Sequence, residues 1–170
     1  MKKTKNRLEY RMYGLVPYNI SPIQQGIQFG HAVVEYGLEH GRTRVINDKV
    51  CTYTQWARND KTFIILNGGT TSTNPESPGT LNYAESELYS MGVQLSTFHE
   101  PDLGDQLTAV VFLVDERVWN KEKYPEWDGT HRGQKVQTGL GPIAHYKNLF
   151  GEDATWVLEM REFLSRFKLA

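Results

Sequence analysis

The sequence predicts an α/β domain with a mixed four-stranded sheet sandwiched by helices, followed by an aromatic-rich C-terminal extension that ends in an amphipathic helix. The 170 residues are enough for one domain with a full hydrophobic core. The hydrophobic content of 39% and the charged content of 23% are typical of a soluble globular protein. Strand-like and helix-like segments alternate as far as residue 115. We therefore expect residues 8–115 to form the α/β domain and residues 116–170 to form an extension packed on it.

The chain begins with a predicted strand and helix. The strand is Tyr10–Val16, a run of aromatic and aliphatic residues that stops at Pro17. The helix has Ser21 as its expected N-cap and Gln24 at the spacing of a capping box. It is expected to continue to about His40, where a glycine follows and can end it.

This helix has two adjacent faces of different character. The first is mostly apolar and consists of Ile23, Ile27, Gly30 and Val34. The second is polar and consists of Gln24, Gln28, His31 and Glu35. Two glycines, Gly26 and Gly30, each lower helix propensity by about 1 kcal/mol relative to alanine. Their presence indicates that something packs or binds against the backbone there.

The middle of the chain continues the alternation. Val50–Asn59 is either a short helix or an irregular link. Lys61–Asn67 is continuously apolar in its centre, which predicts a buried strand. Gly68–Gly79 is rich in Gly, Thr, Ser, Asn and Pro and is expected to be a flexible loop. Leu81–Met91 has the apolar spacing of a helix, and Val93–Phe98 is the third expected strand.

The last third of the chain differs in composition. Gln106–Val114 completes the predicted sheet, and Asp115–Thr138, with its aromatic residues among charges, is expected to form an ordered wrap over the domain. A final helix is predicted from the spacing of Trp156, Met160, Phe163, Leu164 and Phe167. Its apolar face suits core packing or a homodimer seam, and the mixed charge of its polar face argues against membrane binding.

The composition excludes several classes of protein. The formal net charge of −1 provides no overall field to attract nucleic acid or a membrane, although a local basic rim would suffice for RNA. The single cysteine, Cys51, rules out an intramolecular disulfide and a cysteine-based zinc site within one chain. No apolar run approaches the roughly 20 residues that span a bilayer. We therefore expect a reduced, cytoplasmic protein with no membrane partner.

Common cofactor and metal signatures are missing from the sequence. It contains no Gly-x-Gly-x-x-Gly after the first strand, no phosphate loop and no serine nucleophile elbow. His40, His131 and His145 are too scattered to indicate a metal site. The sequence predicts neither a cofactor nor a metal ion.

Two distant segments carry the polar residues that indicate a ligand site. Ser21–Ala32 places a histidine and glutamines on the first helix, and Phe98–Ala109 places acidic residues in a tight loop before a strand. Small α/β domains build ligand sites where a polar loop at a strand end faces a polar helix. His31 is either an acid, base or hydrogen-bond donor, or a helix histidine that bonds a neighbouring carbonyl. Gln28, one turn earlier, can hold a ligand or orient this histidine.

The other candidates also have two interpretations each. Gln24 either contacts a ligand or serves only in the capping box. Glu100, Asp102 and Asp105 either act as a base or cation ligand, or are solvated turn residues. Thr108 begins the fourth strand, where threonine is common on β-propensity alone. His99, next to the first of these acids, is expected to point to the opposite side of an extended chain.

The order of these segments resembles the type-II peptidyl-tRNA hydrolase family. In particular, it is similar to small bacterial and tailed-phage members with a Ser-Pro…Gln-x-Gly-His-Ala helix and a Phe-x-Glu-Pro-Asp…Leu-Thr-Ala segment. The resemblance covers roughly residues 8–115. It implies a compact α/β sandwich that hydrolyses the ester between a stalled peptide and tRNA.

The resemblance also implies roles for individual residues. His31 would be catalytic with Glu100 or Asp102 as the base, while Gln28 and Thr108 would bind the terminal adenosine region of tRNA. Gln24 lies at or beside the family's helix-start lysine, yet no Lys or Arg occurs from residue 21 to residue 28. The loop before the fourth strand is also shorter and lacks the family's Arg-Thr-Gln stretch. Losing such an electrostatic contributor typically lowers a rate by roughly 10²–10³.

Three functions are therefore open. The first is hydrolysis of peptidyl-tRNA, with the 3′ end of tRNA as partner. The second is a catalytically inactive phage protein, in the host cytoplasm, that sequesters a small nucleotide such as a cyclic defence signal; its aromatic side chains would stack on bases. The third is a host-protein interaction module that uses the Trp119–Trp127 segment and the last helix.

Overall fold

The computed structural model describes residues 7–41, 50–131, 134–135 and 140–170. The chain divides into two compact units, one reaching Val114 and including Phe167–Ala170, and the other spanning Asp115–Arg166. The observed division lies one residue before the expected one. The last four residues return to the first unit, where the Asn67 amide donates to the Lys168 carbonyl at 2.8 Å.

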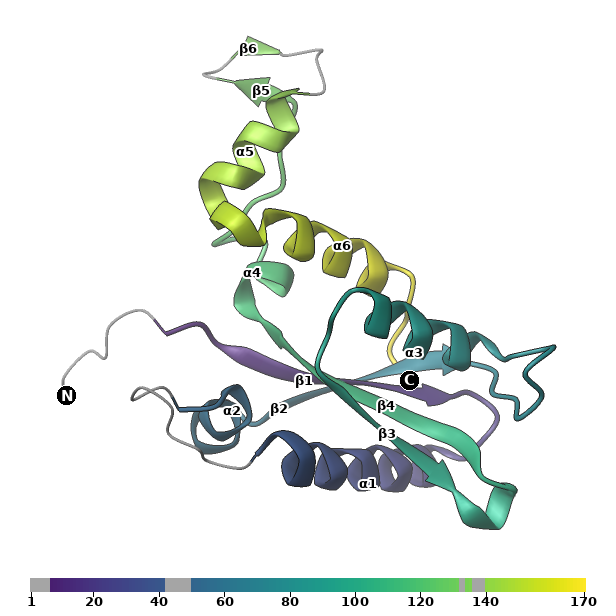
Figure 1. The fold of residues 1–170 in the computed structure, drawn as a ribbon. Coiled ribbons are helices and arrows are strands. Elements are labelled where there is room, and N and C mark those ends of the chain that lie inside the picture. Colours follow the sequence, from purple (N-terminus) through teal and green to yellow (C-terminus); the bar gives the residue numbers. More distant parts are fainter. Residues whose placement is uncertain (1–6, 42–49, 132–133, 136–139) are drawn as a thin grey trace. The chain divides into compact units, whose positions relative to one another are not determined.

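The first unit is built on the mixed four-stranded sheet that the sequence predicts. Its strands are β1 (Tyr10–Pro17), β2 (Thr62–Gly69), β3 (Leu95–Glu100) and β4 (Gln106–Asp115), in the order β2-β1-β4-β3 (Figure 1). β1 and β2 are parallel, and β3 and β4 are antiparallel. The prediction of a buried second strand holds for Leu66 but not for the whole strand. β2 is an edge strand, which leaves Phe63 51% exposed.

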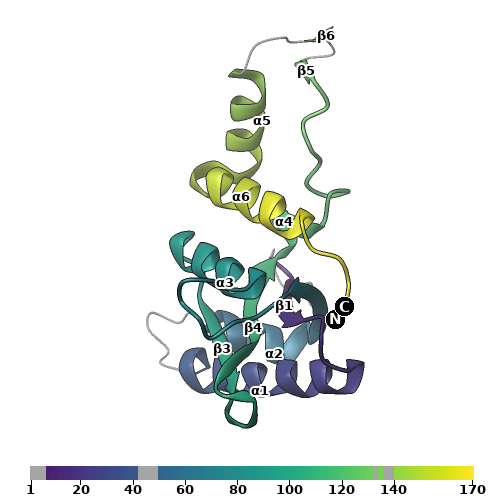
Figure 2. The ribbon, with the colours of Figure 1, turned by 90° about the vertical axis from the view of Figure 1, so that its right-hand side faces the viewer.

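Three helices cover the two faces of this sheet. Figure 2 shows α1 (Pro22–His40) and α2 (Thr52–Asn59) on one face and α3 (Thr80–Ser90) on the other. The segment 50–59, for which the sequence allowed either a short helix or an irregular link, contains the helix α2. The core under α1 and α2 consists of Met12, Val16, Phe29, Ala32, Tyr36, Trp56, Ala109, Val111 and Leu113.

The start of α1 follows the capping signals in the sequence. Ser21 Oγ accepts from the Gln24 amide at 3.3 Å, and the Ser21 amide donates back to Gln24 Oε1 at 3.0 Å. The helix ends at His40, as expected, and buries Gln28 and Phe29 in its first turns. The ring of Phe29 lies against Gly14, where a Cβ would come within 2.2 Å of the ring. Only glycine at residue 14 gives this ring room.

The hairpin formed by β3 and β4 contains a β-bulge. Phe98 pairs with Ala109 and His99 pairs with Leu107, so Thr108 is an extra residue without a partner on β3. An extra residue interrupts the alternation of side chains along a strand. Thr108 therefore faces α1 together with its neighbour Ala109, whereas Leu107 faces the α3 side.

The second unit contains α4 (Glu116–Trp119), β5 (Thr130–His131), β6 (Gln134–Lys135), α5 (Leu140–Phe150) and α6 (Ala154–Ser165). Its buried apolar side chains are Val118, Phe150, Ala154, Val157, Met160 and Phe163. The final helix that the sequence predicts is α6, but Phe167, which is expected on its apolar face, lies after the end of the helix and belongs to the first unit. The part of the expected wrap at residues 132–133 and 136–138 lies outside the described residues. Among the helices that the structure describes, none combines the length and apolarity needed to cross a membrane.

Candidate functional site

The two polar segments of the sequence meet at Gln28. Its Nε2 donates to Glu100 Oε2 at 2.6 Å, and its Oε1 accepts from Thr108 Oγ1 at 2.8 Å. Gln28 is only 6% exposed and Thr108 is fully buried. The side-chain amide of Gln28 is therefore fixed in one orientation, with its nitrogen toward the carboxylate and its oxygen toward the hydroxyl.

The hairpin geometry explains why these three side chains meet. Phe98 and Glu100 are two residues apart on β3 and face the same side of the sheet, toward α1. The bulge turns Thr108 to that side as well, and its hydroxyl lies 3.2 Å from the Phe98 carbonyl oxygen. Without the extra residue, regular alternation would point this threonine away from α1.

His31 lies one turn after Gln28 on α1 and is exposed. Its ring contacts the ring of Phe98 with a centroid distance of 4.4 Å and a tilt of 58°. Neither ring nitrogen has a hydrogen-bond partner among the described residues. The structure therefore holds the imidazole against an aromatic ring beside the Gln28 network and leaves its nitrogens open to a ligand.

Two of the predicted site residues do not join this network. The side-chain oxygen of Gln24 accepts from the Ser21 amide, so Gln24 closes the capping box. Asp102 is exposed in the short 3₁₀ helix Pro101–Leu103, at the tip of the hairpin. The structure brings together His31, Gln28, Glu100 and Thr108, and it leaves the other two at the periphery.

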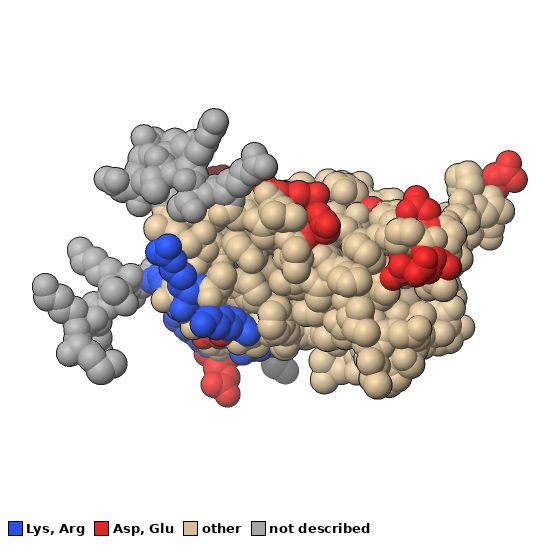
Figure 3. Space-filling model, turned by 90° about the horizontal axis from the view of Figure 1, so that it is seen from below, with Lys and Arg blue, Asp and Glu red and all other residues tan. Residues whose placement is uncertain are grey.

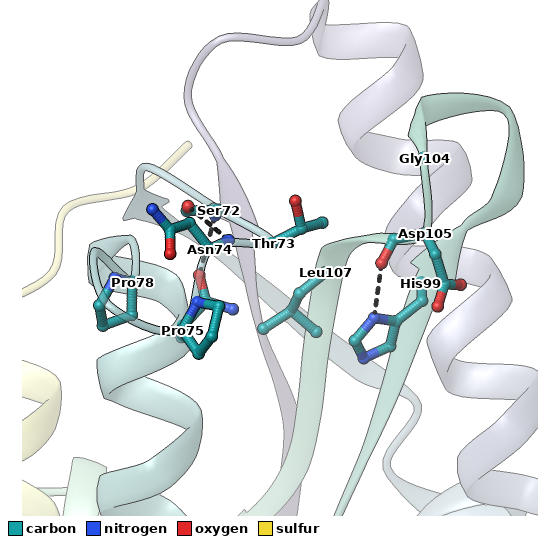
Figure 4. A pocket seen from close by; sticks show the side chains of 10 residues that line it. Ser72, Thr73, Asn74, Pro75, Pro78, His99, Gly104, Asp105 and Leu107 are labelled. Atoms are coloured by element: carbon teal, nitrogen blue, oxygen red, sulfur yellow. Dashed lines mark hydrogen bonds between the residues drawn. The ribbon is translucent and has the colours of Figure 1, made fainter.

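A second feature of the first unit is a cavity of about 450 Å³ on the α3 side of the sheet. Its walls come from the β2–α3 loop and the end of the β3–β4 hairpin (Figure 4). His99 Nδ1 is 3.1 Å from the Asp105 carbonyl oxygen, which fixes the imidazole beside Leu107. The lining residues are Ser72, Thr73, Asn74, Pro75, Pro78, Asn82, His99, Gly104, Asp105 and Leu107.

The loop that forms one wall of this cavity is tied together by its own polar groups. The Thr70 amide donates to Thr80 Oγ1 at 2.8 Å, and the Thr80 amide donates to Thr70 Oγ1 at 3.2 Å. Asn82 Oδ1 accepts from the amides of Ser72 and Gly79. The segment is a loop, as the sequence predicts, and these hydrogen bonds hold the cavity wall in a defined shape.

A titratable group lies near the cavity on α3. Burial raises the pKa of the Glu85 carboxyl above its usual value, and the nearby His99 opposes that rise. The sequence alone does not predict this cavity. The available signals were the orientation of His99, opposite to Glu100, and the concentration of turn-forming residues in the β2–α3 loop.

The charged residues on the α1 side are unevenly distributed. Figure 3 shows this side with the left and right of Figure 1 preserved. Lys and Arg gather at the end near α2, and Asp and Glu lie mainly toward the opposite end and along one edge. Most of the surface between them is uncharged. Across the described residues, no group of three or more His, Cys, Asp or Glu side chains is placed to hold a metal ion.

Fold and site together define an α/β sandwich with a buried glutamine that links a helix to an acidic hairpin. Comparison with protein-family models finds no match to this chain, and comparison with curated proteins finds no significant one.

Proposed function

We propose that the first unit binds the 3′ end of tRNA beside Gln28 and hydrolyses the ester of peptidyl-tRNA. The observation that supports this is the 2.6 Å hydrogen bond between Gln28 and Glu100, which joins two motifs 72 residues apart. These are the motifs on which the resemblance to type-II peptidyl-tRNA hydrolases rests. An exposed histidine one turn further along α1 adds a side chain of the kind that serves as a general acid.

The residues divide the chemistry as follows. Glu100 accepts a proton from water, whose oxygen forms a bond with the ester carbon. His31, in its protonated form, donates a proton to the ribose oxygen as the ester C–O bond breaks. Gln28 holds the carboxylate in place, and Thr108 fixes Gln28. The products are a free peptide acid and a tRNA with a free ribose hydroxyl.

A single-turnover assay with enzyme in excess over peptidyl-tRNA tests this proposal. We expect the wild-type protein to release the peptide, and we expect His31→Ala and Glu100→Gln each to slow release by roughly 10²–10⁴. Asp102→Asn is the matched control, because Asp102 lies on the same hairpin but outside the network. The proposal fails if the wild-type protein leaves peptidyl-tRNA intact while an active hydrolase cleaves it in parallel.

The cavity on the α3 side favours a second candidate, binding of a nucleoside without chemistry. None of its ten lining residues is Lys or Arg, so the cavity offers no side-chain cation for a phosphate. Pro75, Pro78 and the ring of His99 supply flat or apolar surfaces for a base, and Asn74 supplies an amide for its polar edge. Separate calorimetric titrations with uridine, adenosine and the monophosphate of each nucleoside test this candidate. Binding of neither nucleoside at about 1 mM would eliminate it.

A further inference from the structure

The outer face of α1 carries large apolar side chains that contact nothing in the described structure that would bury them. Ile23 is 78% exposed, Val34 61% and Leu38 62%, and Ile27 is 49% exposed. These residues lie opposite the buried face of the helix, which contains Gln28, Phe29, Ala32 and Tyr36. The sequence predicts the stripe of Ile23, Ile27, Gly30 and Val34, and the structure turns it toward solvent. A surface helix normally presents polar residues there.

The stripe has nearly the same pattern in both directions from Gly30. Ile27 lies three residues before it and Val34 four residues after it. Ile23 and Leu38 lie seven before and eight after. A second copy of the helix, antiparallel and crossing at Gly30, would therefore pair Ile27 with Val34 and Ile23 with Leu38. Such self-complementarity is the requirement for a two-fold interface.

Gly30 lies at the centre of the pattern, and none of the described residues blocks the approach of a second helix to it. A Cβ added at Gly30 would meet no atom within 4 Å, so packing within the first unit does not require glycine there. Glycine inside a helix costs about 1 kcal/mol relative to alanine. Small residues at a crossing point allow two helix backbones to come close. A second helix crossing at Gly30 would explain why a glycine is present despite its lower helix propensity.

The charges at the two ends of α1 also favour an antiparallel copy. Tyr53 of α2 contacts Gly37 near the C-terminal end of α1, and α2 carries the exposed Arg58. The hydrogen bond from Gln28 to Glu100 places the hairpin, with the exposed Asp102, beside the N-terminal half. Figure 3 shows Lys and Arg gathered at the end near α2, with a few Asp and Glu side chains beside them and most of the other Asp and Glu side chains away from that end. An antiparallel pair brings the basic end of each copy to the acidic end of the other.

We propose that the outer face of α1 binds a second copy of this chain, with a two-fold axis passing near Gly30. The test of this proposal does not depend on the proposed hydrolase or nucleoside-binding function, but His31 lies next to Gly30, so a partner helix crossing there and a tRNA at His31 would compete for the same edge of α1. It assigns a partner to the apolar face of α1, whereas the sequence predicts a dimer seam only on the last helix.

Sedimentation equilibrium of the full chain tests the proposal with two matched variants. Gly30→Gln adds a long side chain at the crossing point, and Gly26→Gln adds the same side chain one turn earlier, off the line of the stripe. A Cβ at either position meets nothing within 4 Å, so both variants are expected to fold with equal or higher thermal stability. We expect the wild-type protein and Gly26→Gln to dimerise, and Gly30→Gln to weaken dimerisation by about tenfold or more. A wild-type monomer at about 100 μM, or a dimer that Gly30→Gln leaves intact, would overturn the proposal.

A cross-linking experiment tests the direction of the helices. In a Cys51→Ser background, we expect Gly30→Cys to form an intermolecular disulfide under mild oxidation. Gly26→Cys should not, because eight residues along antiparallel helices separate its two copies by about 12 Å. A disulfide requires Cα atoms within about 7 Å. Equal cross-linking of the two variants, or cross-linking of Gly26→Cys alone, would rule out a crossing at Gly30.

Discussion

Replacing Thr108 with valine removes one buried hydroxyl and keeps nearly the same side-chain volume. This hydroxyl has a single hydrogen, and it lies 2.8 Å from Gln28 Oε1 and 3.2 Å from the Phe98 carbonyl oxygen. The shorter distance indicates that the hydrogen is directed mainly at Gln28. In Thr108→Val, the amide oxygen of Gln28, in a side chain that is 6% exposed, loses its donor.

The expected loss of stability follows from the cost of an unsatisfied acceptor. A buried polar group left without a partner costs about 1–3 kcal/mol of unfolding free energy. Thr108→Ser is the matched control: it keeps the hydroxyl and removes one methyl group, which is worth about 0.8 kcal/mol plus a term for the small cavity. We therefore expect Thr108→Val to be at least as destabilising as Thr108→Ser, although valine is the more apolar residue in a fully buried position.

Urea unfolding followed by far-ultraviolet circular dichroism measures both losses. The double variant Gln28→Leu/Thr108→Val provides a further check, because removing both polar partners should cost less than the sum of the two single changes. The reasoning is refuted if Thr108→Val changes the unfolding free energy by less than about 0.5 kcal/mol. It is equally refuted if Thr108→Ser is the more harmful substitution.

Three other changes have outcomes that the structure determines. Gly14→Ala forces a methyl group into the ring of Phe29 and should lower the unfolding free energy by about 1–3 kcal/mol in urea titrations. Burial raises the pKa of Glu85, so its contribution to the unfolding free energy should fall as the pH rises from the usual glutamate range through the raised pKa. Urea unfolding between pH 4 and pH 7 measures this fall, and Glu85→Gln should remove it. The Arg7 guanidinium lowers the pKa of Asp60, so the stability from this pair should be present above the usual aspartate pKa and lost as the pH falls through the lowered one. Asp60→Asn should destabilise the protein at pH 7 and make acid unfolding less steep.

The parts of the fold that the sequence predicts are those with local signals. The serine cap, the capping-box glutamine and the glycine after residue 40 define α1, and the structure confirms both of its ends. Short runs of β-branched and aromatic residues define the strands. Each of these signals depends on a few neighbouring residues, so it can be read without knowing the tertiary structure.

The orientation of α1 illustrates what local signals leave open. The helix has two apolar faces. One is the stripe centred on Gly30, and the other consists of Phe29, Ala32 and Tyr36, with the polar Gln28 at its edge. Either set could face a sheet. The buried set packs against a remote residue, Gly14, whose lack of a side chain makes room for the ring of Phe29. Periodicity alone gives no information on such a contact.

The sequence predicts part of the candidate site and leaves the rest undetermined. The resemblance brings Gln28, Glu100 and Thr108 to one place, and the structure joins them by hydrogen bonds. Simple alternation along β4 would have pointed Thr108 away from α1. The bulge that turns it toward α1 cannot be inferred from the strand's sequence, so this contact was not predictable from the strand alone. The cavity was missed because its walls come from a loop and a hairpin whose packing depends on contacts distant in sequence.

His99 and Glu100 are neighbours on β3 that face opposite sides of the sheet, so two adjacent substitutions separate the two proposed functions. Glu100→Gln removes the base beside α1 and should slow peptidyl-tRNA hydrolysis by roughly 10²–10⁴ while leaving nucleoside binding unchanged. His99→Gln alters the cavity wall and should weaken nucleoside binding while leaving hydrolysis unchanged. Both variants are measured in both assays, after circular dichroism confirms that each is folded. Independent effects require two sites on opposite faces of the sheet. If each substitution impairs both activities, the hairpin carries a single coupled site, and the assignment of separate functions to the two faces is wrong.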